Sequence, residues 1–190
     1  LGHFHNSKEA FLKEREKTYK EDFKRAAHFI FLNRTSFNGI YRVNQKGNYN
    51  VPYGYRVNVD LVTPELLLSV HKKLQSTEIN CHDFEQSISN ISQGDFVYID
   101  PPYVASHQNN GFLEYNQKLF SWEDQIRLHH YIQVLENKKV CYLLSNAAHE
   151  TIKSLYKDIR EPIIVTRYSK IGGKGAWRGQ INEFLFTNLV

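Results

Sequence analysis

One short segment constrains the fold of this chain more than any other. Phe96–Ile99 is a continuous apolar run, as in a strand buried on both faces of a sheet, and it leads directly into Asp100-Pro101-Pro102-Tyr103. From Phe96 onward, apolar runs alternate with stretches of helical pattern. This alternation of strands and helices predicts a parallel sheet with crossover helices, so we expect an α/β fold.

Capping residues and periodicity place the other elements. A helix is expected over Asn6–Leu32, followed by an Asn- and Gly-rich segment with a hairpin turn at Gln45–Asn48. Thr63-Pro64-Glu65 favours the start of a helix that runs to about Leu74. The later elements are expected to be strands at Ile79–Cys81, Val140–Leu144, Ile163–Arg167 and Glu183–Thr187, and helices at Ser121–Glu136 and Thr151–Asp158.

Polar residues follow three of the expected strands. Asp83, Asp100 and Ser145-Asn146 each lie just past a strand end. Because ligands of open α/β sheets bind at the carboxyl ends of the strands, we expect these side chains to converge on one edge of the sheet.

The Asp-Pro-Pro-Tyr segment suits one kind of substrate. Two adjacent prolines remove two backbone donors, so the Asp100 carboxylate and the Pro101 carbonyl are left as acceptors. An exocyclic amino group on a flat ring brings two N–H donors, and two acceptors would localise its lone pair and stabilise positive charge during attack. Tyr103 offers a ring on which a base flipped out of its duplex can stack. The plainer interpretation is a tight Pro-Pro turn after a strand.

Charge and composition narrow the class of protein. The formal net charge is +4, and the stretches Arg34–Val59 and Pro162–Asn182 each hold four basic residues and no acid. Both stretches carry aromatics and glycines, a pattern that suits DNA phosphates and unstacked bases, or else two solvated loops. No apolar run approaches the ~20 residues that span a bilayer, so we expect no membrane partner. Two distant cysteines favour a reducing cytoplasm and no metal site.

Five motifs, in order along the chain, resemble the Dam-like DNA adenine-N6 methyltransferases, which modify adenine in GATC and related sites. The resemblance covers nearly the whole chain, and Asp100-Pro101-Pro102-Tyr103 matches the amino-methyltransferase motif of the family. The other matching segments are Phe31–Asn44, Lys46–Gly54, Leu144–Asn146 and Arg167–Asn188.

This resemblance implies a Rossmann-like methyltransferase sheet that ends in an antiparallel hairpin, with an inserted helical and hairpin subdomain for DNA recognition. We expect the target-recognition region at residues 1–76 and the catalytic region at residues 77–190. The implied substrate is double-stranded DNA, the implied cofactor is S-adenosylmethionine, and the implied product is N6-methyladenine in GATC. By resemblance, the flipped adenine is held by Asp100, Pro101, Pro102 and Tyr103, and the cofactor by Asp83, Phe84 and Asp100.

The same resemblance assigns contacts with DNA. Phe37 matches a wedging aromatic, and Arg42 matches a position that touches bases, where an arginine suits bidentate contact with guanine. Asn44 and Asn50 match phosphate-contacting positions, although simple turn chemistry explains both asparagines equally well. The full expected set is Arg34, Phe37, Asn38, Ile40, Arg42, Asn44, Asn50, Pro52, Arg56, Lys174 and Arg178.

Two departures from the family pattern leave alternatives open. Tyr55 follows Gly54 where a basic residue is common in the family, which bears on the exact recognition sequence. The family's Gly-rich cofactor loop has no match before Asn33, so we expect it in a missing N-terminal segment. The alternatives are a DNA-binding fragment without catalysis, or an amino-methyltransferase acting on cytosine N4 or on an RNA or protein amide. A restriction endonuclease is a further candidate partner.

Overall fold

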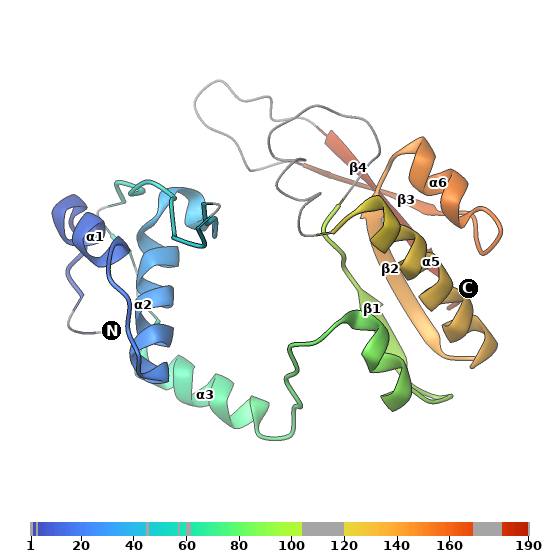
Figure 1. Ribbon diagram of the computed structural model, residues 1–190, viewed down its shortest axis with the longest axis horizontal. Coiled ribbons are helices and arrows are strands. Elements are labelled where there is room, and N and C mark those ends of the chain that lie inside the picture. The colour runs from blue at the N-terminus through green and yellow to red at the C-terminus, as the bar shows by residue number, and fades with distance from the viewer. Residues whose placement is uncertain are drawn as a thin grey trace. The chain divides into compact units, whose positions relative to one another are not determined.

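A computed structural model gives the fold of residues 2, 4–44, 46–56, 58–59, 62–103, 120–168 and 180–189. The chain divides into two compact units, Leu1–Asn80 and Cys81–Val190, and each is described by itself (Figure 1). No helix in these described ranges is long and apolar enough to cross a membrane.

The first unit begins with two helices in place of the single helix predicted over Asn6–Leu32. Helix α1 spans Lys8–Arg15 and helix α2 spans Asp22–Thr35 (Figure 1). Ser7 caps α1, because its side chain accepts a hydrogen bond from the backbone N–H of Ala10. Among the described residues of this unit, Phe11, Phe31 and Leu32 form a buried core cluster.

Glu14 explains why the helix breaks. Its carboxylate accepts hydrogen bonds from Lys17 Nζ at 2.6 Å and from Tyr19 Oη at 2.8 Å, and its carbonyl oxygen lies 2.7 Å from Nε2 of His28. These bonds satisfy the end of α1 with side chains from further along the chain instead of another helical turn. Apolar periodicity alone therefore overestimated the length of the helix.

The Asn- and Gly-rich segment forms a hairpin-like turn, although isolated bridges replace the two predicted strands. Val43 pairs with Tyr49 in an antiparallel bridge, and the backbone N–H of Asn44 donates to the carbonyl of Asn48 at 2.8 Å. The side-chain oxygen of Asn44 also accepts from the backbone N–H groups of Lys46 and Asn48. Asn44 thus closes the turn with its own side chain.

Two further helices complete the described part of this unit. The short 3-10 helix η1 spans Phe37–Gly39, and α3 spans Pro64–Leu74 as predicted. Thr63 caps α3, since its hydroxyl accepts from the backbone N–H of Leu66 at 3.3 Å.

The second unit is built on a four-stranded sheet in the order β1-β2-β4-β3. Strand β1 (Phe96–Ile99) pairs in parallel with β2 (Cys141–Ala147), as the strand–helix–strand pattern predicted. Strand β4 (Gln180–Thr187) runs antiparallel to β2, and β3 (Ile163–Tyr168) runs antiparallel to β4. This mixed α/β arrangement is consistent with a methyltransferase fold.

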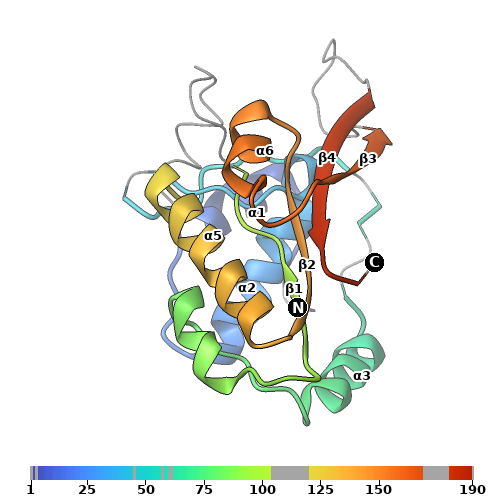
Figure 2. The same cartoon turned by 90° about the vertical axis from the view of Figure 1, so that its right-hand side faces the viewer.

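Helices cover one face of this sheet. Helix α5 spans Trp122–Asn137 and α6 spans Glu150–Tyr156, and the two lie on the same side of the sheet (Figures 1 and 2). The 3-10 helix η2 (Phe84–Asn90) packs against α5. A capping box between Ser121 and Asp124 begins α5 at the predicted place. The core between helices and sheet includes Leu128, Ile132, Leu135, Leu144, Ile152, Phe184 and Phe186.

Strand β1 and the segment before η2 differ from prediction. The side chains of Phe96 and Tyr98 are 55% and 60% exposed, so β1 is not buried on both faces. The reason is that β1 lies at the edge of the sheet formed by the described residues, with helices on one face only. Ile79–Cys81 forms no strand, and Asp83 instead caps η2 by accepting from the backbone N–H of Glu85.

Strand β2 is longer than predicted. Ser145 and Asn146 lie inside the strand, not past its end, because Ser145 pairs with Leu185 and Asn146 with Phe184 on β4. Because it pairs with β4, strand β2 extends past the end of its apolar run.

Candidate active site

The Asp-Pro-Pro-Tyr segment leaves the carboxyl end of β1. The side chain of Asp100 is exposed, Pro101 is buried and Tyr103 is half-buried. The hydroxyl groups of Tyr103 and Ser145 form a hydrogen bond of 2.5 Å, and Ser145 is itself buried near the carboxyl end of β2. The parallel pairing of β1 and β2 therefore brings the polar ends of both strands to one edge of the sheet.

Tyr103 is held in its neutral form. Burial raises the pKa of its hydroxyl, and the charges of Glu183 and Asp100 raise it further, against the opposing effects of Ser145 and Arg167. Arg167 and Glu183 form an ion pair of 2.5 Å between β3 and β4. The Tyr103 hydroxyl therefore stays protonated to higher pH than that of a free tyrosine.

A buried amide pair in the same unit joins Asn146, one of the polar residues expected at the strand ends, to Gln125, which the sequence did not point to. Nδ2 of Asn146 donates to Oε1 of Gln125 at 3.1 Å, and both side chains are fully buried. Nε2 of Gln125 has no hydrogen-bond partner in the described part of the chain. Gln125 shares helical spacing with the buried Leu128, Ile132 and Leu135, and a polar residue on such an apolar stripe indicates a buried polar contact.

A cavity of about 520 Å³ opens beside the Asp-Pro-Pro-Tyr segment. Its lining includes the three residues predicted to hold the cofactor, Asp83, Phe84 and Asp100, which come from the start of η2 and the end of β1. The apolar and aromatic part of the lining includes Val97, Ile99, Phe120, Leu128 and Tyr131. A cavity of this size, mostly apolar with a few convergent polar groups, is typical of a small-molecule site.

Arg127 lines the same cavity, and sequence analysis did not single it out. Its guanidinium pairs with the carboxylates of Asp83, Glu85 and Asp124. The Asp124 pair joins positions three apart on a helix, which the sequence could have revealed. The pairs with Asp83 and Glu85 span more than forty residues, and only the fold brings those groups together.

In the first unit, the predicted wedge lies on a short, tightly turned segment. Phe37 is partly exposed, and its backbone N–H donates to the carbonyl of Pro52 at 2.9 Å. Asn38 adopts a left-handed backbone with φ of 54°, and Ile40 caps the end of η1. The hydrogen bond from Asn33 Nδ2 to the carbonyl of Gly39, at 2.7 Å, ties this segment to α2.

Arg42 and Asn50 face each other across the hairpin. Nε of Arg42 donates to Oδ1 of Asn50 at 2.8 Å, and Nη2 donates to the carbonyl of Asn50 at 3.3 Å. Arg42 and Asn50, both predicted to touch DNA, are therefore coupled, and Asn50 orients the guanidinium of Arg42. Asn44 closes the turn between them, so turn chemistry accounts for its position.

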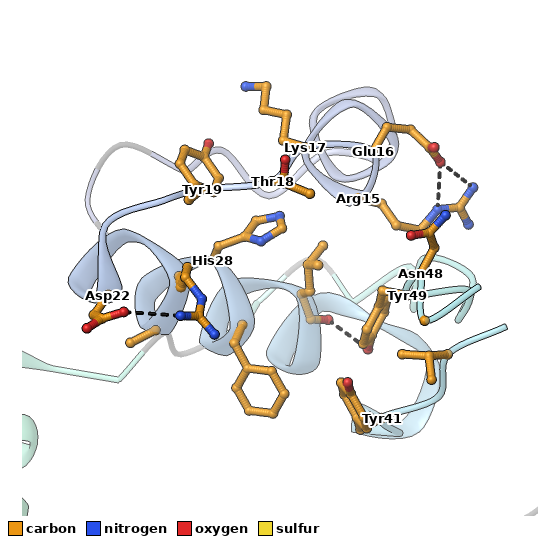
Figure 3. Close-up of a pocket in the computed structure, with 16 residues that line it drawn as sticks. Arg15, Glu16, Lys17, Thr18, Tyr19, Asp22, His28, Tyr41, Asn48 and Tyr49 are labelled. Carbon is orange, nitrogen blue, oxygen red and sulfur yellow. Dashed lines mark hydrogen bonds and ion pairs between the residues drawn. The ribbon is translucent and has the colours of Figure 1, made fainter. Parts of the chain in front are cut away.

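Among the hollows that the described residues of this unit line, two bear on the predicted DNA contacts. A polar hollow of about 380 Å³ is lined by Arg34, Asn38 and Arg56, all predicted to contact DNA, together with Asn33, Gly39, Asn58 and Val59. A larger hollow of about 700 Å³ has an aromatic wall where Tyr41 and Tyr49 lie 5.8 Å apart between ring centres (Figure 3). The cations on its rim are paired within the unit, such as Arg15 with Glu16 (Figure 3). None of the residues predicted to contact DNA lines the larger hollow.

A family model described as D12 class N6 adenine-specific DNA methyltransferase matches residues 1–170. The chain belongs to this family. The match includes both the hairpin of the first unit and the Asp-Pro-Pro-Tyr segment of the second.

Curated relatives of this D12-class chain carry related names. It is 39% identical over 170 residues to the type II methyltransferase M1.LlaDCHI of Lactococcus lactis subsp. cremoris, covering 88% of this chain and 59% of the relative. It is 33% identical over 189 residues to the DNA N-6-adenine-methyltransferase of Escherichia phage P1, covering 95% of this chain and 24% of the relative. It is 29% identical over 184 residues to the DNA adenine methylase of Escherichia coli, covering 95% and 65%. The chain thus spans less than two thirds of the length of each of these relatives.

Two predicted DNA contacts of this D12-class chain, Lys174 and Arg178, lie outside the described residues. Of the other predicted positions, the structure gathers Arg34, Asn38 and Arg56 at one hollow and couples Arg42 to Asn50. It gathers Asp83, Phe84 and Asp100 at the cavity beside Pro101 and Pro102.

Proposed function

We propose that this chain provides the catalytic loop and target-recognition region of an S-adenosylmethionine-dependent DNA adenine-N6 methyltransferase that acts on GATC. The observation that carries the proposal is that Asp100, Pro101 and Pro102 line one cavity together with Asp83 and Phe84. Membership in the D12-class family supports it.

The amino group of adenine explains the choice of residues. The carboxylate of Asp100 and the carbonyl of Pro101 would accept the two hydrogens of that group, which draws its nitrogen toward tetrahedral geometry and localises the lone pair. The same two acceptors would stabilise positive charge on the nitrogen as it attacks. The ring of Tyr103, oriented by Ser145, would stack on the flipped base and contribute ~1–3 kcal/mol.

The cavity of the second unit fits a nucleoside-containing cofactor. Its volume of about 520 Å³ is in the usual range for small-molecule sites, and it combines the ring of Phe84 with the acceptors of Asp83 and Asp100. S-adenosylmethionine, when bound, supplies an activated methyl group, so the protein has mainly to position the reactants. Asp83 and Phe84 would hold the adenosyl part of the cofactor, and Asp100 would lie between cofactor and target base.

We assign target recognition to residues 1–76, as a subdomain inserted in the methyltransferase fold, and catalysis to residues 77–190. Phe37 would wedge into the duplex where the base leaves it. Arg42, oriented by Asn50, would read guanine through two parallel hydrogen bonds. Arg34, Arg56, Lys174 and Arg178 would contact phosphates, and a restriction endonuclease of the same specificity would be a partner.

The test is transfer of a radiolabelled methyl group from S-adenosylmethionine by the full-length protein. Duplexes that contain GATC, the same site already methylated, and a site with one base changed are compared, and the products are digested and separated as nucleosides. We expect label in N6-methyladenine from the unmethylated GATC duplex only. Label in N4-methylcytosine would replace the proposed target atom, and no label in any DNA would overturn the proposal.

A further inference from the structure

Arg127 stands at the centre of a cluster of acidic residues on the wall of the cavity. Its Nη2 lies 2.6 Å from Oδ1 of Asp83 and 2.8 Å from Oε2 of Glu85, and its Nη1 lies 2.8 Å from Oδ1 of Asp124. The centre of the guanidinium lies 4.9 Å from the centre of the Phe84 ring. One planar cation thus contacts three carboxylates and one aromatic face, which the fork geometry of arginine permits and a lysine does not reproduce.

The cluster joins two separate elements of the second unit. Asp124 lies on the first turn of α5, where the capping box with Ser121 sets its position, and Arg127 lies three residues further along the same helix. Asp83 caps η2 through the backbone N–H of Glu85, at 3.0 Å. Arg127 therefore ties the first turn of η2 to the first turn of α5.

Two other aromatic rings also contact the ring of Phe84. Tyr131 meets it edge-on with 5.7 Å between ring centres, and Phe120 meets it at a tilt with 6.2 Å. The hydroxyl of Tyr131 in turn bonds to Ser87 of η2 at 2.7 Å. With Arg127 in place, the orientation of the Phe84 ring is set by its neighbours before any ligand enters.

We propose that Arg127 is a positioning residue for the cofactor: it holds the Asp83 carboxylate and the Phe84 ring in the orientation that the adenosyl group needs. The inference rests on the proposed function, because it takes the cofactor to lie on Asp83 and Phe84. In the described part of the chain, the hydrogen bonds to the Asp83 carboxylate all use Oδ1. Oδ2 would then be the oxygen that accepts a hydrogen bond from a polar N–H group of the cofactor.

Charge supports the same role. The hydrogen bond from Arg127 is the largest influence that lowers the pKa of Asp83, followed by the backbone N–H of Glu85, while desolvation and then the charge of Asp124 act in the opposite direction. The other titratable groups near Asp83 are Glu85 and His82, and Asp100 shares the cavity. Because its pKa is lowered, Asp83 stays an ionised acceptor to lower pH than a free aspartate would. Without Arg127 its pKa would rise, and cofactor binding would weaken at a higher pH.

A purely structural role makes a different prediction. The Arg127 side chain is 36% exposed, and partly exposed ion pairs stabilise a fold little. If the cluster only braced η2 against α5, replacing Arg127 would lower the melting temperature slightly and leave cofactor affinity and its pH dependence unchanged. The two roles are therefore separated by binding measurements rather than by stability.

The experiment compares Arg127→Met and Arg127→Lys in the full-length protein. Arg160→Lys is the matched control, since Arg160 is 39% exposed, pairs with Glu136, and does not line the cavity. The dissociation constant for S-adenosylmethionine is measured from pH 3.5 to pH 8 by calorimetry, a range that includes the ordinary pKa of an aspartate, together with kcat at saturating cofactor and the melting temperature. Asp83→Asn serves as a reference for loss of the negative charge at this position.

We expect Arg127→Met to raise the dissociation constant about tenfold at pH 7.5, as loss of a charge-assisted contact would. We expect the loss of cofactor affinity at low pH to begin at a higher pH in this variant than in wild type. Its kcat at saturating cofactor should stay within about twofold of wild type. Arg127→Lys should recover part of the affinity, and Arg160→Lys should match wild type.

Each contrary result has its own meaning. An unchanged dissociation constant and pH profile in both Arg127 variants, with Asp83→Asn still weakened, would overturn the role of Arg127 and leave the proposed function standing. A loss of affinity that Arg160→Lys shares equally would also overturn it. Failure of the wild-type protein to bind S-adenosylmethionine would instead remove the proposed function on which the inference rests.

Discussion

The two units of this molecule hold their predicted functional residues in different ways. In the second unit, the Asp-Pro-Pro-Tyr segment leaves a strand whose sheet rests on a core of twelve buried residues. In the first unit, Arg42, Asn44 and Asn50 lie on a hairpin held by isolated bridges and turn hydrogen bonds, above a core of three buried residues.

This difference follows from what each unit is proposed to do. Chemistry on an amino group needs acceptors fixed to a fraction of an ångström, which a packed sheet edge supplies. Reading a duplex needs exposed donors that reach into a groove, which a hairpin supplies. Substitutions in the second unit should therefore reduce methyl transfer. Substitutions in the first unit should reduce discrimination between DNA sequences.

The largest expected effect is that of Asp100→Ala. Loss of the carboxylate acceptor should lower kcat about a thousandfold, because the developing charge on the amino nitrogen loses a preorganised partner. Affinity for DNA should stay within a few-fold of wild type, as gel-shift titration would measure. Glu123→Gln, an exposed acid on α5, is the control and should keep full activity. Equal loss of DNA affinity in Asp100→Ala would break the separation between the units.

Arg42→Ala should reduce the discrimination between GATC and other DNA sequences. The ratio of kcat/KM for GATC over a site with its guanine changed should fall about ten- to a hundredfold, the worth of one bidentate guanine contact. Arg25→Ala is the control, because Arg25 is exposed on α2 and pairs with Asp22 at 3.1 Å. If Arg42→Ala weakens all duplexes equally, Arg42 contacts phosphate and not a base.

Gly54→Ala should damage the first unit alone. A Cβ at this position would lie 2.6 Å from the carbonyl oxygen of Ser36, a backbone atom that cannot move aside cheaply. We expect the free energy of unfolding of this unit to fall by about 1–3 kcal/mol, with affinity for S-adenosylmethionine unchanged. Thermal unfolding would measure the change in stability, and calorimetric titration with S-adenosylmethionine would measure the affinity. Gly2→Ala, where a Cβ meets no atom within 4 Å, should change neither quantity.

The smallest expected effect concerns the bond between Tyr103 and Ser145. Tyr103→Phe keeps the stacking ring and Ser145→Ala keeps the strand, so each should lower kcat/KM only about two- to tenfold. The double variant should be no worse than either single one, because both remove the same hydrogen bond. Additive losses would show that Ser145 does not act through Tyr103.

Local sequence patterns were sufficient for part of this molecule. The capped start of α3 at Thr63, the start of α5 at Ser121 and the turn closed by Asn44 were predicted because each depends on neighbours within a few residues. The strand–helix–strand order likewise predicted the parallel pairing of β1 with β2. The Asp-Pro-Pro-Tyr segment could be singled out because its chemistry is contained in four consecutive residues.

The tertiary structure decided what depends on residues far apart in the chain. Glu14 ends α1 only because His28 and Tyr19 return to it, and β2 runs on through Asn146 only because β4 pairs beside it. Arg127 meets Asp83 across forty-four positions, which no local pattern encodes. The sequence by itself thus predicted which groups could take part in the chemistry. The fold decided how they are oriented, because long-range contacts form only when the elements pack.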